Sequence, residues 1–161
     1  MSEFDRLFHD LDAAARDFRA AASDLDAVLE RFEAKLTALR IETDVWLTDS
    51  PLDAHELSVS ASSVATRVER QLGYAPDPRP SVAGRCLCVR KAEVGERPLS
   101  ERVEVLRVIE IARLRDAKSE LRQAALAKLP LLLERMTEQL RSSTEVIRGL
   151  EGSPGADPRA L

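Results

Sequence analysis

Residues 3–43 read EFDRLFHDLDAAARDFRAAASDLDAVLERFEAKLTALRIET and carry the most regular pattern in the chain. Large apolar residues recur at every seventh position, and small or apolar residues fill the stripe between them, as in a helix that packs one side against a core. No glycine or proline interrupts the stretch, and acidic residues in its first turn suit the dipole of a helix N-terminus. The pattern predicts one helix over residues 3–43, with an apolar stripe made of Phe4, Leu11, Phe18, Leu25, Phe32 and Leu39.

The predicted stripe is broad and rich in large side chains. All four phenylalanines of the protein lie on it, and a second row runs beside the first through Phe8, Ala15, Ala22, Leu29 and Leu36. This width exceeds the two-position seam of a simple coiled-coil dimer. Because two helices of one chain cannot cover such a surface, we expect the protein to self-associate as a dimer or a larger assembly.

Residues 99–150 show a second helical pattern. Apolar residues follow one another at helical spacing from Val103 to Leu150, and Glu101 lies in the expected first turn. Pro130 falls inside this segment, where proline removes a backbone hydrogen bond and clashes with the preceding turn at a cost of about 3 kcal/mol or more. The sequence therefore predicts a helix over residues 99–150 that is kinked near residue 130.

Between these helices, residues 44–98 lose the helical period and contain most of the prolines and glycines. Short runs with β character occur at residues 45–47, 66–74 and 85–92. The proline-rich segment 75–83 reads as the connection between the last two runs. We expect a three-stranded antiparallel meander, while residues 52–65 fit either a loop or a short helix.

These patterns together predict a mainly α protein with a small β insert, an α+β class. Two long amphipathic helices would form a hairpin, a coiled-coil-like helical bundle, with the three-stranded meander between them. The length of 161 residues suits one domain, which we assign to residues 1–150. The tail, residues 151–161, is expected to be mobile because it contains helix breakers and no apolar run.

Composition excludes several classes of protein. The chain is 44% hydrophobic and 32% charged, and no run of about 18 uncharged apolar residues could serve as a membrane span. Acidic residues stand near the N-terminus where a secretory signal needs a basic region, so we expect a cytoplasmic protein. Residues 1–42 carry ten acids and six bases, a balance that anionic lipid would repel, and no membrane partner is expected.

The residues that could carry chemistry do not form a recognisable motif. Cys86 and Cys88 would share one face of a strand, but zinc sites normally use a wider spacing and four ligands, and only His9 and His55 could add imidazoles. We expect the cysteines to be small core residues. Asp53, His55 and the nearby serines lack a nucleophile elbow, and phosphate-loop and dinucleotide motifs are missing. We predict no catalytic, metal or cofactor site, and no enzyme.

Two further groups of residues could bind a ligand or a partner. Trp46 and Tyr74 could flank a pocket in the insert, although the small core of the meander is the preferred role. A basic row on the second helix, Arg107, Arg115, Lys118 and Arg122, is interleaved with acids, which disfavours nucleic-acid binding. The function we expect is a non-catalytic interaction or scaffold protein that self-associates or binds a partner protein through its long helices. The alternative is a small regulatory protein that binds nucleic acid through the second helix.

Overall fold

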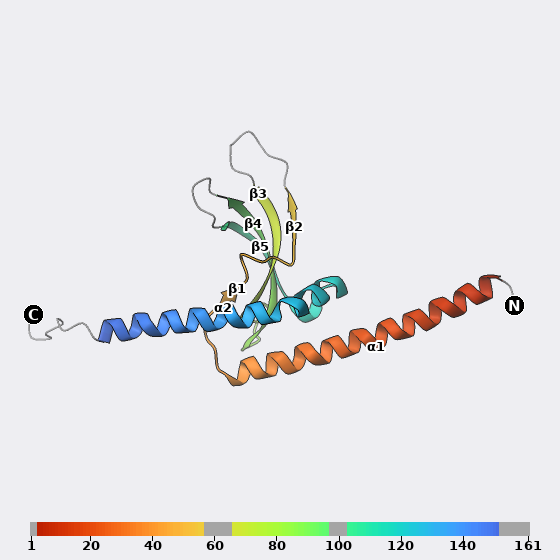
Figure 1. The fold of residues 1–161 in the computed structure, drawn as a ribbon, viewed down its shortest axis with the longest axis horizontal. Coiled ribbons are helices and arrows are strands. Elements are labelled where there is room, and N and C mark those ends of the chain that lie inside the picture. The colour runs from red at the N-terminus through yellow and green to blue at the C-terminus, as the bar shows by residue number, and fades with distance from the viewer. Residues whose placement is uncertain (1–2, 57–65, 97–102, 152–161) are drawn as a thin grey trace, which may run out of the picture.

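The computed structural model describes residues 3–56, 66–96 and 103–151 and shows two long helices and a five-stranded antiparallel sheet (Figure 1). The helices are α1 (Glu3–Ala38) and α2 (Ser119–Glu151), and a short 3₁₀ turn, η1 (Leu114–Asp116), precedes α2. The strands are β1 (Val45–Trp46), β2 (Asp53–Glu56), β3 (Thr66–Pro76), β4 (Arg85–Glu96) and β5 (Val103–Arg113).

The long strands β3, β4 and β5 form the centre and one edge of the sheet. The strand order is β1-β3-β4-β5, and β2 pairs with the other end of β3. Leu72 of β3 lies opposite Val89 of β4, which lies opposite Ala112 of β5, so these three side chains share one face. The pairing of β4 with β5 shifts register twice, between Lys91 and Ala92 and between Glu93 and Val94.

The helices lie side by side across one end of the sheet and run in the same direction (Figure 1). Two contacts establish this direction: Arg122 is ion-paired with Asp26, and further along both segments Gln139 Nε2 donates to the Asp44 carbonyl at 3.1 Å. A parallel arrangement is possible because the whole sheet, rather than a short turn, connects α1 to α2.

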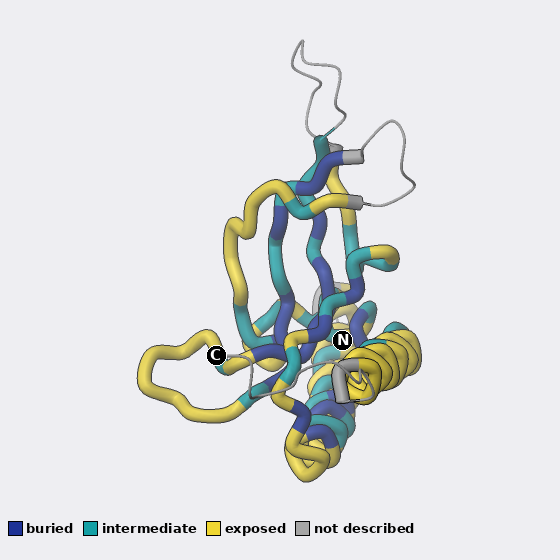
Figure 2. The backbone as a smooth tube through the Cα atoms, turned by 90° about the vertical axis from the view of Figure 1, so that its left-hand side faces the viewer, coloured by how far each residue is buried: buried dark blue, intermediate teal, exposed yellow. Residues whose placement is uncertain are grey.

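The main core lies where both helices meet the sheet (Figure 2). Its helical residues recur at spacings of three and four, which places them on one side of each helix. They are Leu25, Leu29 and Leu36 of α1, and Ala125, Leu129, Leu132 and Met136 of α2. The sheet contributes Leu72, Tyr74, Leu87 and Val89.

The predicted fold, a mainly α helical hairpin with a small three-stranded insert, is wrong. The chain is an α+β protein with a five-stranded sheet, and it is not a helical hairpin, a helical bundle or a coiled coil. The three segments predicted as strands do form β1, β3 and β4. The error lies at residues 103–113, which form β5 rather than the start of a helix, because their many valines and isoleucines favour extended backbone.

The boundaries of both helices also differ from the predicted ones. Helix α1 ends at Ala38, because the chain turns through Arg40 with a left-handed φ of 51°. Helix α2 begins at Ser119 and continues through Pro130 without interruption. Of residues 52–65, the first part forms β2 and residues 57–65 lie outside the described residues, as does the tail 152–161.

Candidate functional site

The N-terminal half of α1 projects away from the sheet and from α2 (Figure 1). Along it the described side chains are exposed or half-exposed, and the first buried one is Leu25. Four large apolar side chains are open to solvent: Leu7 is 52% exposed, Phe8 68%, Leu11 63% and Phe18 56%. We call these four residues the apolar row.

The structure divides the predicted stripe into a core part and an exposed part. Leu25 is buried and Phe32 is packed against the core, whereas Leu11 and Phe18 are exposed and belong to the apolar row. Leu39 lies beyond the end of α1 and is exposed. The Phe4 side chain lies outside the described part of the structure. The core of the single chain therefore explains why the C-terminal half of the stripe is apolar. It does not explain why the N-terminal half is apolar.

A groove begins where the apolar row ends. It has a volume of about 340 Å³ and lies between α1 and the first turns of α2. Its walls are small or apolar for the most part, with Asp24 at the edge; the lining residues are Phe18, Ala21, Ala22, Asp24, Leu25, Val28, Gln123 and Leu126. The groove and the row share Phe18, so they form one continuous surface.

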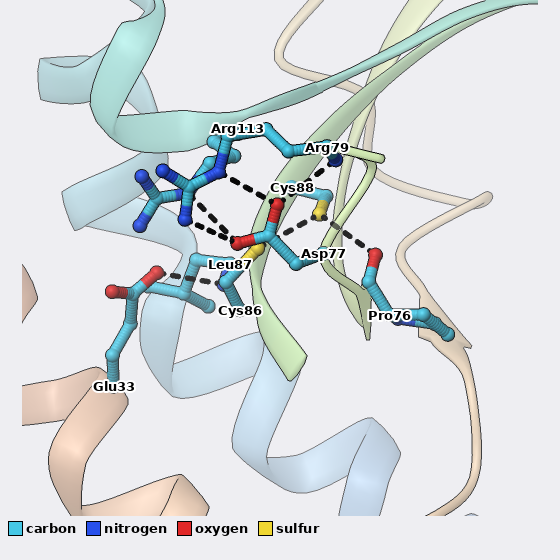
Figure 3. A network of polar contacts seen from close by, with 8 residues as sticks. All are labelled: Glu33, Pro76, Asp77, Arg79, Cys86, Leu87, Cys88 and Arg113. Atoms are coloured by element: carbon cyan, nitrogen blue, oxygen red, sulfur yellow. Dashed lines mark hydrogen bonds and ion pairs between the residues drawn. The ribbon is translucent and has the colours of Figure 1, made fainter. Parts of the chain in front are cut away.

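A separate polar network surrounds the two cysteines (Figure 3). The Sγ atoms of Cys86 and Cys88 are 3.5 Å apart, and both side chains are buried on the same face of β4. Asp77, in the connection between β3 and β4, is 2.8 Å from Arg79 Nη2 and 3.4 Å from Arg113 Nε. Between the cysteines, the Leu87 backbone N–H donates to Glu33 Oε1 at 2.8 Å and joins the strand to α1.

The contacts in this network shift the pKa values of its ionisable groups in different directions. The hydrogen bond from the Cys88 thiol lowers the pKa of Cys86, and Arg113 lowers it further by the same kind of contact. The same thiol contact, together with burial, raises the pKa of Cys88. The hydrogen bond from Arg79 lowers the pKa of Asp77 from 3.8 to about 2. Cys86 is therefore the more acidic thiol of the pair.

Trp46 and Tyr74 do not flank a common pocket. Tyr74 is buried in the main core, on the helix side of the sheet. Trp46 lies opposite Gly73 on the other face and packs against Ala75 and the cysteines. The guanidinium of Arg90 lies 4.4 Å from the centre of the Trp46 ring. The insert pocket predicted from these two aromatics is not formed by them.

Another cavity lies between the sheet and the start of α2. It has a volume of about 490 Å³, an apolar floor and a rim of both acids and bases. Arg70 is tied to Asp53 at 2.7 Å on this rim. His55 Nε2 is 4.0 Å from Asp53, and the serines that the sequence suggested as nucleophiles fall outside the described residues. The rim therefore has no dominant charge that would select one class of ligand.

The predicted basic row is spread over three elements and is largely paired with acids. Arg107 belongs to β5 and lies 3.7 Å from Glu93, and Arg115 belongs to η1 and lies 2.6 Å from Glu30. Arg122 pairs with Asp26, and Lys118 lines the cavity between the sheet and the start of α2. These basic side chains hold the two helices and the sheet together instead of forming one free surface.

No protein-family profile, curated protein or solved structure matches this chain. Within residues 3–56, 66–96 and 103–151, no helix has the length and hydropathy needed to span a membrane. In the same ranges no three His, Cys, Asp or Glu side chains are grouped so that they could hold a metal ion. The apolar row with its groove is not explained by folding alone.

Proposed function

We propose that this protein is a non-catalytic interaction protein that holds two copies of itself together through the N-terminal half of α1. The observation that carries the proposal is the apolar row, whose four large side chains are more than half exposed on a helix that extends beyond the core. Soluble monomers rarely leave a contiguous apolar surface uncovered. A second copy is the occupant that fits this surface best, because the surface is complementary to itself.

The complementarity lies in the order of large and small side chains along α1. The bulky Phe8 stands about 21 Å from Ala22, whose small side chain lines the groove. If two copies of α1 cross in opposite directions at Ala15, Phe8 of each copy meets Ala22 of the other. Both grooves are then filled by one two-fold symmetric contact, the commonest arrangement of homodimers.

Sedimentation velocity over a range of concentrations tests the proposal. The wild-type chain should dimerise at tens of micromolar, and Phe8→Asp or Phe18→Asp should give a folded monomer. Ala20→Asp is the matched control, because it adds the same charge to the same half of α1 at an exposed position on the other side of the helix.

A wild-type chain that stays monomeric throughout this range would refute self-association. A dimer that survives Phe8→Asp and Phe18→Asp would move the interface away from the apolar row. Nucleic-acid binding, the alternative from the sequence, has less support because Arg107, Arg115 and Arg122 already contact acids.

A further inference from the structure

Strand β5 forms an open edge of the sheet. The strand order is β1-β3-β4-β5, and within the described ranges no strand pairs with the outer side of β5, which is 11 residues long. The sheet extends beyond both helices (Figure 1). Four large apolar side chains of β5 are open to solvent: Leu106 is 52% exposed, Val108 45%, Ile109 42% and Ile111 39%.

An edge of this length is normally protected, because its unpaired N–H and C=O groups attract a further strand. Lysine, proline and a short strand are common protections, and residues 103–113 have none of them. Two register shifts against β4 bend the edge, which is another protection. The residues that these shifts leave without a partner in β4 are Leu106 and Ile109, so the irregularity adds exposed apolar surface to the edge.

The sequence of β5 is complementary to itself. If two copies of β5 pair antiparallel with Val108 opposite Ile109 of the other copy, Leu106 lies opposite Ile111 and Arg107 opposite Glu110. Symmetry repeats each pair, so over residues 106–111 every apolar residue meets an apolar residue and every charge meets the opposite charge. A shift of one residue in either direction would place Arg107 opposite an isoleucine instead.

The two faces of the sheet agree with this register. Arg107 and Glu110 pair with alternate residues of β4, in the same row as Val89 of the main core, so both charges lie on the helix side. Val108 and Ile111 pair with the residues of β4 in between and lie on the other side. A two-fold axis perpendicular to the sheet keeps each face on its own side, so the charged pairs and the apolar pairs stay separate.

We propose that β5 is a second self-association surface, where the edges of two copies pair antiparallel in this register. The proposal goes beyond the dimer described above, since it uses another element and other side chains. Because the register shifts interrupt the outer row of backbone hydrogen bonds, this contact should be weaker than the contact between two α1 helices. A chain that uses both surfaces contacts two different copies, so the protein should assemble beyond the dimer as its concentration rises.

Disulfide cross-linking between two different cysteine variants tests the register. Opposite residues in an antiparallel pair have Cβ atoms about 4.5–5.5 Å apart, close to the span of a disulfide. Leu106→Cys chains mixed with Ile111→Cys chains should therefore give a linked dimer under mild oxidation. Either variant alone should not, because each residue lies about 17 Å along the strands from its own copy. All chains carry Phe8→Asp, which removes the contact between α1 helices.

Further substitutions in the same mixture test which side chains hold the edges together. Ile109→Lys should abolish the cross-link, since lysine is a common protection of an edge strand. Leu133→Lys is the matched control, because Leu133 is 40% exposed on α2, and it should leave the yield unchanged. Circular dichroism of every variant would establish that the fold is retained.

The charged pair has its own readout in the cross-linking yield. Arg107→Glu should lower the yield several-fold, because it places two carboxylates opposite each other, and Arg107→Glu with Glu110→Arg in one chain should restore it. Arg107 is 71% exposed, so its ion pair with Glu93 contributes little to the fold of the single chain.

Three results would overturn the proposal. The first is no linked dimer from the mixture of folded chains, which would show that the register shifts protect the edge. The second is an equal yield from Leu106→Cys chains alone, which would indicate random collision. The third is a cross-link that Ile109→Lys leaves unchanged. Each outcome is separate from the dimer through α1, because every chain in the test carries Phe8→Asp.

Discussion

The Trp46 indole lies directly against Gly73, so a Cβ atom at Gly73 would stand 2.2 Å from Trp46 Cε3 and 2.6 Å from the Val45 carbonyl oxygen. On its other side the ring is covered by the Arg90 guanidinium, 4.4 Å from the ring centre. Glycine is therefore required at this position by the closeness of β1 to β3, and the ring is held between two neighbours.

We predict that Gly73→Ala destabilises the protein by about 1–3 kcal/mol, the usual cost of overpacking. Trp46→Leu should recover only part of that loss, because the Val45 carbonyl remains in the way. Gly149→Ala is the control: nothing lies within 4 Å of its added methyl group, and alanine stabilises a helix by about 0.5–1 kcal/mol over glycine. Urea denaturation measures all three, and equal effects at the two glycines would contradict the packing described.

The core and the apolar row should respond differently to truncation. Leu132 of α2 is 0% exposed, so Leu132→Ala should lower the free energy of unfolding by about 2–5 kcal/mol. Leu7 is 52% exposed, and Leu7→Ala should change the stability of the monomer by less than about 0.5 kcal/mol.

Thermal unfolding at two protein concentrations separates these effects. For a dimer the melting temperature rises with concentration, and Leu7→Ala should reduce that dependence while Leu132→Ala lowers the melting temperature at both concentrations. A large loss of monomer stability from Leu7→Ala would mean that the N-terminal half of α1 packs within its own chain.

Asp77 should make the fold sensitive to acid. Its pKa falls from 3.8 to about 2 on folding, chiefly through the hydrogen bond from Arg79. A carboxyl with a lowered pKa stabilises the folded state above its unfolded value, and that contribution is lost as the pH falls from about 4 to about 2. Urea denaturation across this window should show a smaller loss for Asp77→Asn than for the wild type. Asp10→Asn, an equal change of charge on exposed α1, should follow the wild-type curve.

The sequence predicts which residues of α1 enter the core, because the spacing of apolar residues along one helix is a local pattern. Leu25, Leu29 and Leu36 recur at helical spacing and are buried. The end of α1 has no such signal, since the chain leaves the helix at Arg40 through a left-handed φ of 51° without glycine or proline. Strand β5 was predicted as helix because Val103, Leu106 and Ile109 also fit a helical spacing. Its two shifts of register against β4 break the alternation that would have revealed a strand.

The candidate sites depend on contacts between distant parts of the chain, which a pattern of residues does not report. The stripe on α1 was predicted as one surface, yet whether Leu25 or Phe18 is covered depends on where α2 begins. The cysteine spacing did indicate a shared strand face. The charged neighbours of the pair, Asp77 and Arg113, come from the connection between β3 and β4 and from β5.

A series of hydrogen-bonded polar side chains lies on the face of the sheet away from the helices and ends at Trp46. Gln71 is 0% exposed, donates from Nε2 to Glu69 Oε2 at 3.0 Å and accepts from Arg90 Nη2 at 2.6 Å. Gln71→Met keeps the approximate shape but leaves a buried carboxylate and a guanidinium each short of a partner. We expect a loss of about 1–3 kcal/mol in the free energy of unfolding.

A double-mutant cycle with Arg90→Met isolates the contact between the two side chains. If the hydrogen bonds stabilise the fold as described, the second substitution should cost less once the first is present, with a coupling of about 0.5–3 kcal/mol. Arg141→Met, at an exposed position of α2, serves as the control and should be nearly neutral. Additive effects of Gln71→Met and Arg90→Met would show that Arg90 stabilises the sheet through its stacking on Trp46 alone.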